Sequence, residues 1–209
     1  MGNGDIILAE QAASRLRRIS AGGKVTTISG GGSLRTVPVL DAVKAKAFSI
    51  VPDDVGDGGP ASDAVILGPR GVLVGPAGDI YLSEGGGHRV RRIDPAGTIT
   101  TVAGTGISGF GGDGGPAIAA QLFRPSGLAL DAAGNLFIGD SLNQRIRVVT
   151  PAGIIATLAG TGSLGYSGDG GPASTATFSR PGGLALTTDG SRLLVADEDN
   201  RVVRQIELG

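Results

Sequence analysis

The stretch that decides the fold covers residues 124–179 and opens with RPSGLALDAAGNLFIGDSLNQRIRVVTPAGIIATLAGTG, residues 124–162. Four apolar runs of strand length lie in it: 127–130, 136–138, 146–149 and 154–158. The segments AAGN, DSLNQ and PAG separate them, and a long glycine-rich loop closes the unit. Short apolar runs divided by turn residues are typical of antiparallel strands. The stretch therefore predicts a four-stranded meander, which buries little unless copies of it pack on both sides.

The chain supplies those copies at a fixed interval of 56 residues. Pro69, Pro125 and Pro181 keep this interval, and the aspartates of three glycine-rich loops keep it as well. The first strand is expected at 72–74, 128–130 and 184–186, and the second at 6–8, 80–82, 136–138 and 193–195. The third is expected at 16–19, 90–93, 146–149 and 202–206, and the fourth at 25–28, 99–102 and 154–158. The chain thus begins at a second strand and ends at a third strand.

A single domain of four units follows from this repeat, with approximate limits 1–68, 69–123, 124–179 and 180–209. The first unit lacks its first strand and the last lacks its fourth. An insert at 33–54, between the fourth strand and the glycine-rich loop of the first unit, contains LDAVKAKAF and is expected to form one or two helical turns. In the last unit we expect TTDGSR to have gained one residue and DEDNR to have lost one.

Meanders repeated around an axis are the blades of an all-β propeller. The motif P-x-G-L-A-L-D-x-x-G-N-L-F-I-x-D-x-x-N-x-R-I-R, residues 125–147, resembles the NHL repeat, and His88-Arg89-Val90 stands at the place of the motif's His-Leu pair. The AGTG and GDGGPA loops resemble the form found in bacterial members of that family. The resemblance covers nearly the whole chain outside 33–54. It implies a propeller, usually of six blades, that most often binds a partner.

The length of 209 residues is too short for six such blades. Three interpretations follow: an open arc that completes its propeller by assembly, a closed ring of four blades, or a fragment of a larger propeller without independent activity. We favour the arc, because both terminal units expose an unpaired strand edge and the chain has no cysteine to staple a small ring. The expected partner is a second copy of the chain or another protein.

Composition excludes several classes of function. The net charge of −1 gives no electrostatic attraction for nucleic acid. Because no run of 18 apolar residues occurs, membrane insertion is not expected. The absence of cysteine excludes disulfides and thiolate chemistry. We expect a soluble protein, and a chain without cysteine fits both an exported and a cytoplasmic bacterial protein.

An acidic residue ends the second strand of each unit, and an arginine opens the third. We predict a structural carboxylate–guanidinium clamp across this loop, because arginine's planar fork suits a carboxylate. A ring of acids that binds a cation is the functional alternative. The predicted pairs are Glu10–Arg15, Glu84–Arg89, Asp140–Arg145 and Asp197–Arg201.

The three G-D-G-G-P-A loops, at 56–61, 112–117 and 168–173, are expected on the same propeller face as the loops between second and third strands. Their aspartates are expected to accept hydrogen bonds from their own loop amides, with calcium as an alternative ligand. Aromatic residues just before two of the loops either pack the loop down or offer a contact. The candidate binding face therefore comprises Asp57, Asp113, Asp169, Phe110, Tyr166, Asn143 and His88.

Catalysis has little support in the sequence, so we predict a non-enzymatic module with no metal ligands. The single histidine, His88, provides neither a three-histidine zinc site nor a base for a serine triad. Two G-x-G-x-x-G matches, at 104–109 and 160–165, run into GDGGP instead of a helix, which argues against a dinucleotide site. The alternative is an enzyme of the lactonase or lyase type with a metal in a closed central channel, to which Asn135, Asn143 and Asn200 could contribute.

Overall fold

The computed structural model describes residues 4–30 and 56–209. The predicted insert at 33–54 and its helical turns lie outside this part of the chain. The described residues form an all-β structure of four separate antiparallel sheets. The observed strands match the predicted number of first, second, third and fourth strands, so the fold class and the incomplete terminal units are as predicted.

Each sheet is a meander in which sequence neighbours pair. The first sheet contains β1 (Ile6–Glu10), β2 (Arg15–Ile19) and β3 (Val25–Ser29). The second contains β4 (Pro69–Val74), β5 (Ile80–Glu84), β6 (Arg89–Ile93) and β7 (Ile99–Ala103). The third contains β8 (Pro125–Leu130), β9 (Leu136–Asp140), β10 (Arg145–Val149) and β11 (Ile155–Ala159). The last contains β12 (Pro181–Leu186), β13 (Arg192–Asp197) and β14 (Val202–Glu207).

In the three units that contain it, the first strand starts three residues earlier than predicted, at the repeated proline. A register shift follows that proline, between Pro125 and Leu128 in β8 and at the equivalent places in β4 and β12. Such an irregularity bends the strand, and Gly127 lies where the bend brings the backbones of successive units together. A Cβ at Gly127 would lie 2.2 Å from the carbonyl oxygen of Gly182. The P-x-G signature thus marks the contact between the innermost strands of neighbouring sheets.

Apolar side chains fill the space between successive sheets. One buried cluster, with Leu16 and Leu82, joins the first and second sheets. A second, with Val90 and Ile138, joins the second and third, and a third, with Ile146 and Val195, joins the third and last. Every internal sheet is therefore covered on both faces. Successive side chains of a strand point to opposite faces of the sheet. Alternate apolar residues therefore pack on the preceding sheet and on the following sheet.

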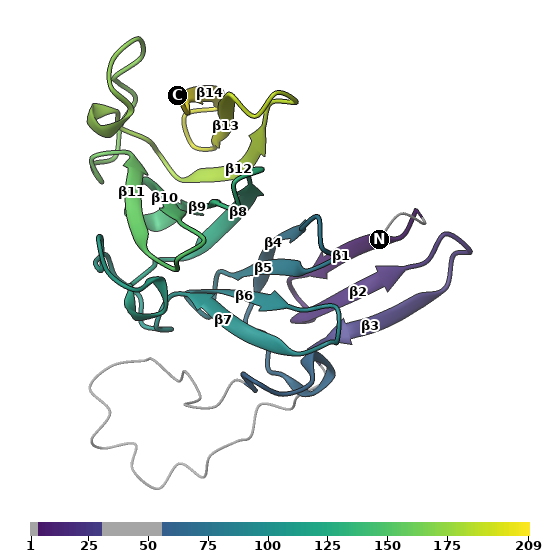
Figure 1. Ribbon diagram of the computed structural model, residues 1–209. Coiled ribbons are helices and arrows are strands. Elements are labelled where there is room, and N and C mark those ends of the chain that lie inside the picture. The colour runs from purple at the N-terminus through teal and green to yellow at the C-terminus, as the bar shows by residue number, and fades with distance from the viewer. Residues whose placement is uncertain (1–3, 31–55) are drawn as a thin grey trace, which may run out of the picture.

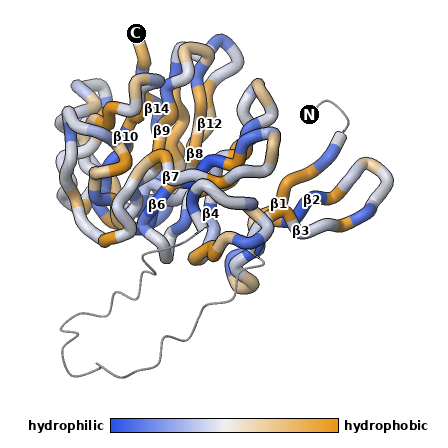
Figure 2. The backbone as a smooth tube through the Cα atoms, turned by 60° about the horizontal axis from the view of Figure 1, so that its bottom comes forward, coloured by the Kyte–Doolittle hydropathy of each residue, from blue (hydrophilic) through white to orange (hydrophobic). Residues whose placement is uncertain are grey.

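The sheets follow one another around a curve, with β4, β8 and β12 neighbouring each other near its inner side (Figure 1). The first and last sheets lie at opposite ends of this arc (Figure 1). Figure 2 shows the hydrophobic strand β1 at the N-terminal end, where none of the other three described sheets precedes it. The structure therefore has the architecture of consecutive propeller blades, each outer sheet being one strand short.

The GDGGPA loops tie neighbouring sheets together at the outer edge. In the loop 112–117, the amides of Gly114 and Ala117 donate to β11 and its preceding turn, at Ile155 and Gly153, each at 2.8 Å. The short 3₁₀ helix η2 (Ala117–Ala119) turns back to the previous sheet, where its Ala117 carbonyl accepts from the Gly104 amide at 2.9 Å. The helices η1 (Ala61–Asp63) and η4 (Ala173–Thr175) stand at the same place in the other loops, and η3 (Ser141–Asn143) lies between β9 and β10.

Candidate functional site

The predicted clamp exists in a different pairing. The acid that ends each second strand contacts the arginine seven positions later, not the arginine that opens the third strand. In the third sheet, Asp140 faces Arg145 in the strand register, but its carboxylate bonds to Arg147 at 3.3 Å. The observed pairs are Glu10–Arg17, Glu84–Arg91, Asp140–Arg147 and Asp197–Arg204.

The arginine that opens the strand has another task. Arg145 donates to the carbonyls of Asn143 at 3.0 Å and Thr161 at 2.6 Å, and its guanidinium lies 3.7 Å from the ring centroid of Phe110. Arg89 likewise donates to the Thr105 carbonyl at 3.0 Å. These contacts fasten the AGTG loop, and they turn the opening arginine away from the acid.

The spacing of seven residues also corrects the expected deletion in DEDNR. Asp197 and Arg204 keep the spacing of Asp140 and Arg147, so the last unit gains a residue and loses none. Arg201 is therefore the equivalent of Gln144, and both have left-handed backbone conformations, with φ of 58° and 53°. Arg201 stands in a turn and not at the clamp position.

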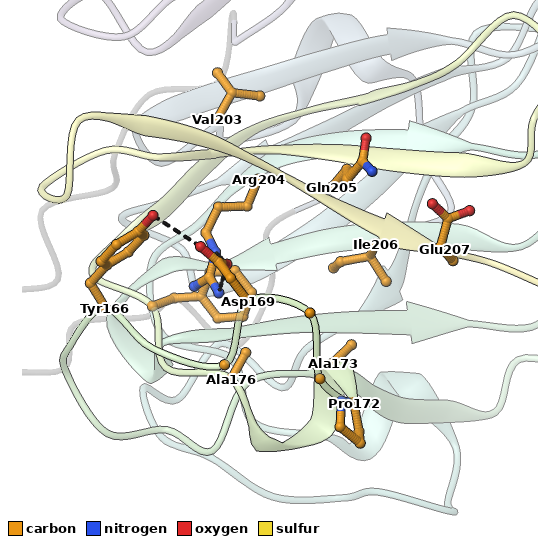
Figure 3. A pocket seen from close by; sticks show the side chains of 14 residues that line it. Tyr166, Asp169, Pro172, Ala173, Ala176, Val203, Arg204, Gln205, Ile206 and Glu207 are labelled. Atoms are coloured by element: carbon orange, nitrogen blue, oxygen red, sulfur yellow. Dashed lines mark hydrogen bonds and ion pairs between the residues drawn. The ribbon is translucent and has the colours of Figure 1, made fainter.

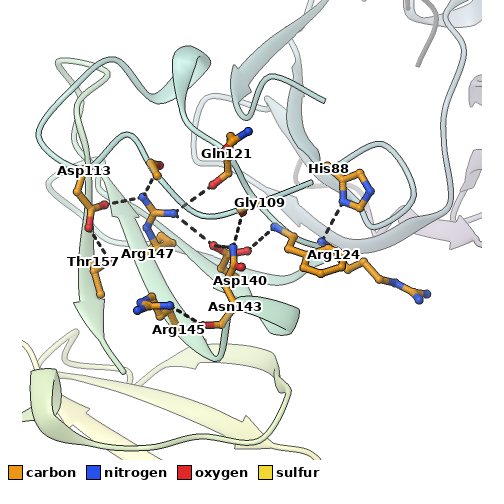
Figure 4. Close-up of polar contacts among 12 residues, drawn as sticks. His88, Gly109, Asp113, Gln121, Arg124, Asp140, Asn143, Arg145, Arg147 and Thr157 are labelled. Carbon is orange, nitrogen blue, oxygen red and sulfur yellow. Dashed lines mark hydrogen bonds and ion pairs between the residues drawn. The ribbon is translucent and has the colours of Figure 1, made fainter. Parts of the chain in front are cut away.

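Each of the three GDGG aspartates contacts the same arginine from the opposite side. Arg147, whose side chain is fully buried, is held between Asp140 and Asp113, with Asp113 at 2.5 Å (Figure 4). Its guanidinium also donates to the carbonyls of Gly111 at 3.2 Å and Gln121 at 3.4 Å. Arg91 lies between Glu84 and Asp57, and Arg204 between Asp197 and Asp169, in the same manner.

The loop aspartates therefore do not follow the expectation that they bind the amides of their own loops. Asp57 accepts a hydrogen bond from the Thr101 amide of β7, and Asp113 accepts one from the Thr157 hydroxyl of β11, at 2.7 Å. The cation beside each aspartate is an arginine side chain. A buried charge is tolerated only when it is paired and hydrogen-bonded, and two carboxylates per guanidinium provide that pairing.

Burial dominates the protonation of the inner acids. It raises the pKa of Glu84 to about 7 and that of Asp140 to about 6, although Arg91 and Arg147 oppose the shift. Both carboxyl groups lie in the sheet interior, where the charged form loses its hydration. Their perturbed pKa values accordingly have a structural cause, and neither carboxyl lines an open cleft.

The remaining candidate residues also bind the protein's own backbone. Asn143 donates from its side-chain amide to the Gly109 carbonyl at 2.7 Å and to Asp140 at 2.8 Å, and Asn200 makes the same pair of bonds in the last unit. The asparagine of the NHL-like motif thus fastens the loop that contains Phe110 or Tyr166 to the inner acid.

His88 joins two sheets. Its Nδ1 accepts a hydrogen bond from the Arg124 amide at 3.2 Å (Figure 4). Its ring packs against that of Phe123 at a tilt of 59°, with a centroid separation of 5.6 Å. Burial, aided by Arg124, lowers the pKa of His88. Gln144 does the same work one unit later, accepting from the Arg180 amide at 2.7 Å.

The two aromatic residues pack on the arginines. Phe110 lies under Arg145 and, at 5.0 Å, near Arg147. Tyr166 donates its hydroxyl to Asp169 at 3.0 Å and lies 5.2 Å from the Arg204 guanidinium. The two residues are still 43% and 57% exposed, so they can offer an aromatic contact at the surface.

In the described part of the chain, the polar side chains of the repeated motif bind one another and the protein's own backbone. Residues 4–30 and 56–209 contain no group of three or more His, Cys, Asp or Glu side chains placed to hold a metal ion. The same residues contain no helix with the length and hydropathy needed to cross a bilayer. The repeated polar constellation therefore builds the blades.

The sequence predicted unpaired strand edges at the two ends of the arc, and the structure shows exposed apolar side chains there as well. In β1, Ile6 and Leu8 are 59% and 44% exposed, whereas the equivalent Ile80 and Leu82 of β5 are 4% and 0% exposed. These internal residues pack on the preceding sheet. We call the N-terminal surface formed by Ile6, Leu8 and Val25 the leading face.

The C-terminal end of the arc also exposes an apolar side chain that is buried in the internal sheets. Val203 of β14 is 71% exposed, whereas Val90 and Ile146 at the same position of β6 and β10 are fully buried against the following sheet. We call the surface of the last sheet that contains Val203 and Leu194 the trailing face. The repeat alignment itself contained this signal, because a position that is apolar in every unit is expected to be covered in every unit.

Comparison with known proteins gives the context of the fold. Residues 106–167 match the model of the Teneurin NHL domain. NHL repeat-containing protein 2 of Bos taurus is 38% identical over 101 residues, which are 47% of this chain and 14% of the relative. The structure is similar to that of an auxiliary nutrient binding protein from Bacteroides thetaiotaomicron, with a TM-score of 0.65 and 19% identity, over 98% of this chain and 45% of the other. It is also similar to a streptogramin B lyase, with a TM-score of 0.58 and 15% identity, over 100% of this chain and 49% of the other. The chain thus spans about half of these solved propellers and a small part of the curated relative.

Proposed function

Because the chain belongs to the NHL-repeat family of β-propeller proteins, we propose that it is a non-enzymatic binding and scaffold module that completes its propeller with a second copy of itself. The observation that carries this proposal is the exposure of Ile6, Leu8 and Val203 at the ends of the arc. Their equivalents in every internal junction of the described structure are 0–4% exposed.

The two end faces fit a head-to-tail contact. The leading face corresponds to the side of a sheet that packs on the preceding sheet, and the trailing face to the side that packs on the following one. A trailing face of one copy against a leading face of another therefore repeats a junction that the chain already forms internally. Such a heterologous contact closes into a ring when its rotation allows. The chain covers 45–49% of the two solved propellers, so two copies supply the length of one ring.

Charged substitutions at the two faces test the proposal. Leu8→Asp in the leading face and Val203→Asp in the trailing face should each convert the assembly to single chains in sedimentation velocity. Leu164→Asp is the matched control, because Leu164 is also apolar and 70% exposed but lies in the 160–165 loop. The control should sediment like the wild-type protein. Assembly that survives both face variants would overturn the proposal.

A further inference from the structure

The charged side chains that hold the blades together recur in phase, whereas those at the inner ends of the first strands do not. Asp169 and Arg204 of the last unit (Figure 3) repeat the pair Asp113 and Arg147 of the third unit (Figure 4). By contrast, the residue after the repeated proline differs in all three units that contain it: Arg70, Ser126 and Gly182. A position that changes from unit to unit is not needed to build a blade, so its side chain can serve another purpose.

The neighbouring second strand leaves room for whichever side chain stands at this position. In the second sheet, a Cβ at Gly85 would lie 2.6 Å from the Nε of Arg70. In the last sheet, a Cβ at Gly182 would collide with the side chain of Glu198. Gly85 and Glu198 each follow the acid that ends the second strand of their unit. Glycine therefore accommodates an arginine in one sheet and a glutamate in the other.

Two more arginines stand directly before the repeated proline. Arg124 and Arg180 have left-handed backbone conformations, with φ of 53° and 55°, and the equivalent residue of the second sheet is Gly68, with φ of 59°. This conformation suits glycine and is strained for a residue with a bulky side chain. The chain has arginine at this place twice, although the fold accepts glycine there. Backbone strain of this kind gathers at functional sites.

The three arginines come together where β4, β8 and β12 meet. A Cβ at Gly71, next to Arg70, would collide with the Ser126 carbonyl oxygen of β8, and β8 meets β12 through a contact of the same kind. Burial lowers the pKa of Arg70, and the positive charges of Arg124 and Arg180 lower it further. Like charges at one place disfavour one another, so this cluster favours the approach of an anion.

Acids of the chain compensate only one of the three arginines directly. Arg180 pairs with Asp199 at 3.1 Å and with Glu198 at 3.6 Å. Within the part of the chain that the structure describes, Arg70 and Arg124 form no ion pair, and the Nε of Arg70 makes no hydrogen bond. Glu198 acts on Arg70 only through its charge, which raises the pKa of that guanidinium. The cluster thus sets three guanidinium groups against two carboxylates and keeps an excess of positive charge.

We propose that Arg70, Arg124 and Arg180 bind an oxyanion of a small organic ligand, a carboxylate or a phosphate, at the inner ends of the first strands. The planar guanidinium presents parallel N–H donors that match the oxygens of both groups. An anion held between the three side chains also offsets their mutual repulsion. This inference goes beyond the proposed assembly, because the cluster contains no residue that defines the leading or the trailing face.

The test is a titration of the protein with citrate and with pyrophosphate at constant ionic strength, measured by isothermal titration calorimetry. The inference predicts saturable binding of at least one probe. Tighter binding of citrate identifies a carboxylate as the preferred group, and tighter binding of pyrophosphate identifies a phosphate. Arg70→Gln should weaken binding of the tighter probe about tenfold, the loss expected for one hydrogen bond between charged groups.

Lys24→Gln is the matched control for the loss of one positive charge. Lys24 is exposed and lies in the turn between β2 and β3, outside the cluster. The substitution should change the affinity for the probe less than twofold. A loss as large as that of Arg70→Gln would overturn the inference, because the probe would then respond to the overall charge of the protein and not to a site.

Two further variants distinguish a lost ligand contact from a lost fold. Arg124→Gly should weaken probe binding about tenfold without lowering the melting temperature, because glycine suits the left-handed backbone. A lower melting temperature would count against the inference, since the arginine would then stabilise the fold itself. Asp199→Asn removes one of the two carboxylates that pair with Arg180, so this variant should bind the probe several-fold more tightly than the wild-type protein.

The Leu8→Asp protein separates this inference from the proposed assembly. Its substitution lies in the leading face, so it should bind the probe as tightly as the wild-type protein, whether or not either one assembles. Absence of saturable binding of both probes would overturn the inference, and so would equal affinity of Arg70→Gln and the wild-type protein.

Discussion

Replacing Arg147 with methionine is expected to lower the melting temperature of the protein by about 6–20 °C. The substitution keeps much of the side-chain volume but removes the guanidinium from a fully buried position. It leaves the Asp140 carboxylate, which is 0% exposed, without its cation, and it leaves the carbonyls of Gly111 and Gln121 without a donor. Removal of one partner of a buried ion pair costs about 3–5 kcal/mol. For a domain of this size each kcal/mol corresponds to about 2–4 °C.

Arg145→Met is the matched control, because Arg145 lies two positions earlier on the same strand and is only half buried. It loses two hydrogen bonds to loop carbonyls and the contact with Phe110, which together are expected to cost about 1 kcal/mol. Both variants are compared with the wild-type protein by differential scanning calorimetry at one protein concentration, since assembly makes the melting temperature depend on concentration.

A double variant locates the source of the loss. Asp140→Asn retains an acceptor for the Phe123 amide, which donates to Asp140 at 2.7 Å, but removes the buried charge. Arg147→Met with Asp140→Asn should therefore lose less stability than the sum of the two single variants. If Arg147→Met is no more destabilising than Arg145→Met, the buried arginine does not hold the blade together and the reasoning fails.

Three further predictions concern the loops and the inner acids. Gly112→Ala should destabilise the protein at least twice as much as Gly114→Ala in chemical denaturation. Both glycines have positive φ, and a left-handed alanine by itself costs about 1 kcal/mol. Only at position 112 would the added Cβ also meet backbone, 2.7 Å from the Ala120 Cα. Gln144→Ala should cost about 1–3 kcal/mol in the same assay because the Arg180 amide loses its acceptor, and Gln144→His should recover part of this, as His88 serves in the equivalent position; equal losses in both variants would contradict the role. The folded-state pKa of Glu84 is raised to about 7, so the stability that this carboxyl contributes is fully present below about pH 4.5 and is lost as the pH rises through 7. The stability of Glu84→Gln relative to wild type should therefore increase between pH 5 and pH 8. A constant difference would argue against the raised pKa.

The sequence predicted the blades well because their signals are local and repeated. Strand-length apolar runs, turn residues and a 56-residue interval gave the meander, the missing first strand of the first sheet and the missing fourth strand of the last one. The start of β8 at Pro125 was missed, since the register shift before Leu128 lies where the apolar alternation stops.

The site was predicted less well because the groups that bind its arginine side chains come from segments distant in the sequence. The residues Asp140 and Arg145 do face each other in the register, so the predicted clamp was reasonable from spacing alone. What redirects the two side chains is Asp113, Gly111 and Thr161, which loops bring in from up to 36 residues away. No pattern within one repeat contains that information, although an arginine in phase in all four units was a usable sign.

The absolute mass of the wild-type chain in solution, measured by light scattering from dilute to concentrated samples, tests the central claim most directly. The chain mass is 20.6 kDa. Head-to-tail closure of two arcs predicts a plateau at twice that value, which does not grow further with concentration. A mass of one chain across the whole series would contradict the account, because the leading and trailing faces of this chain would then remain uncovered in solution.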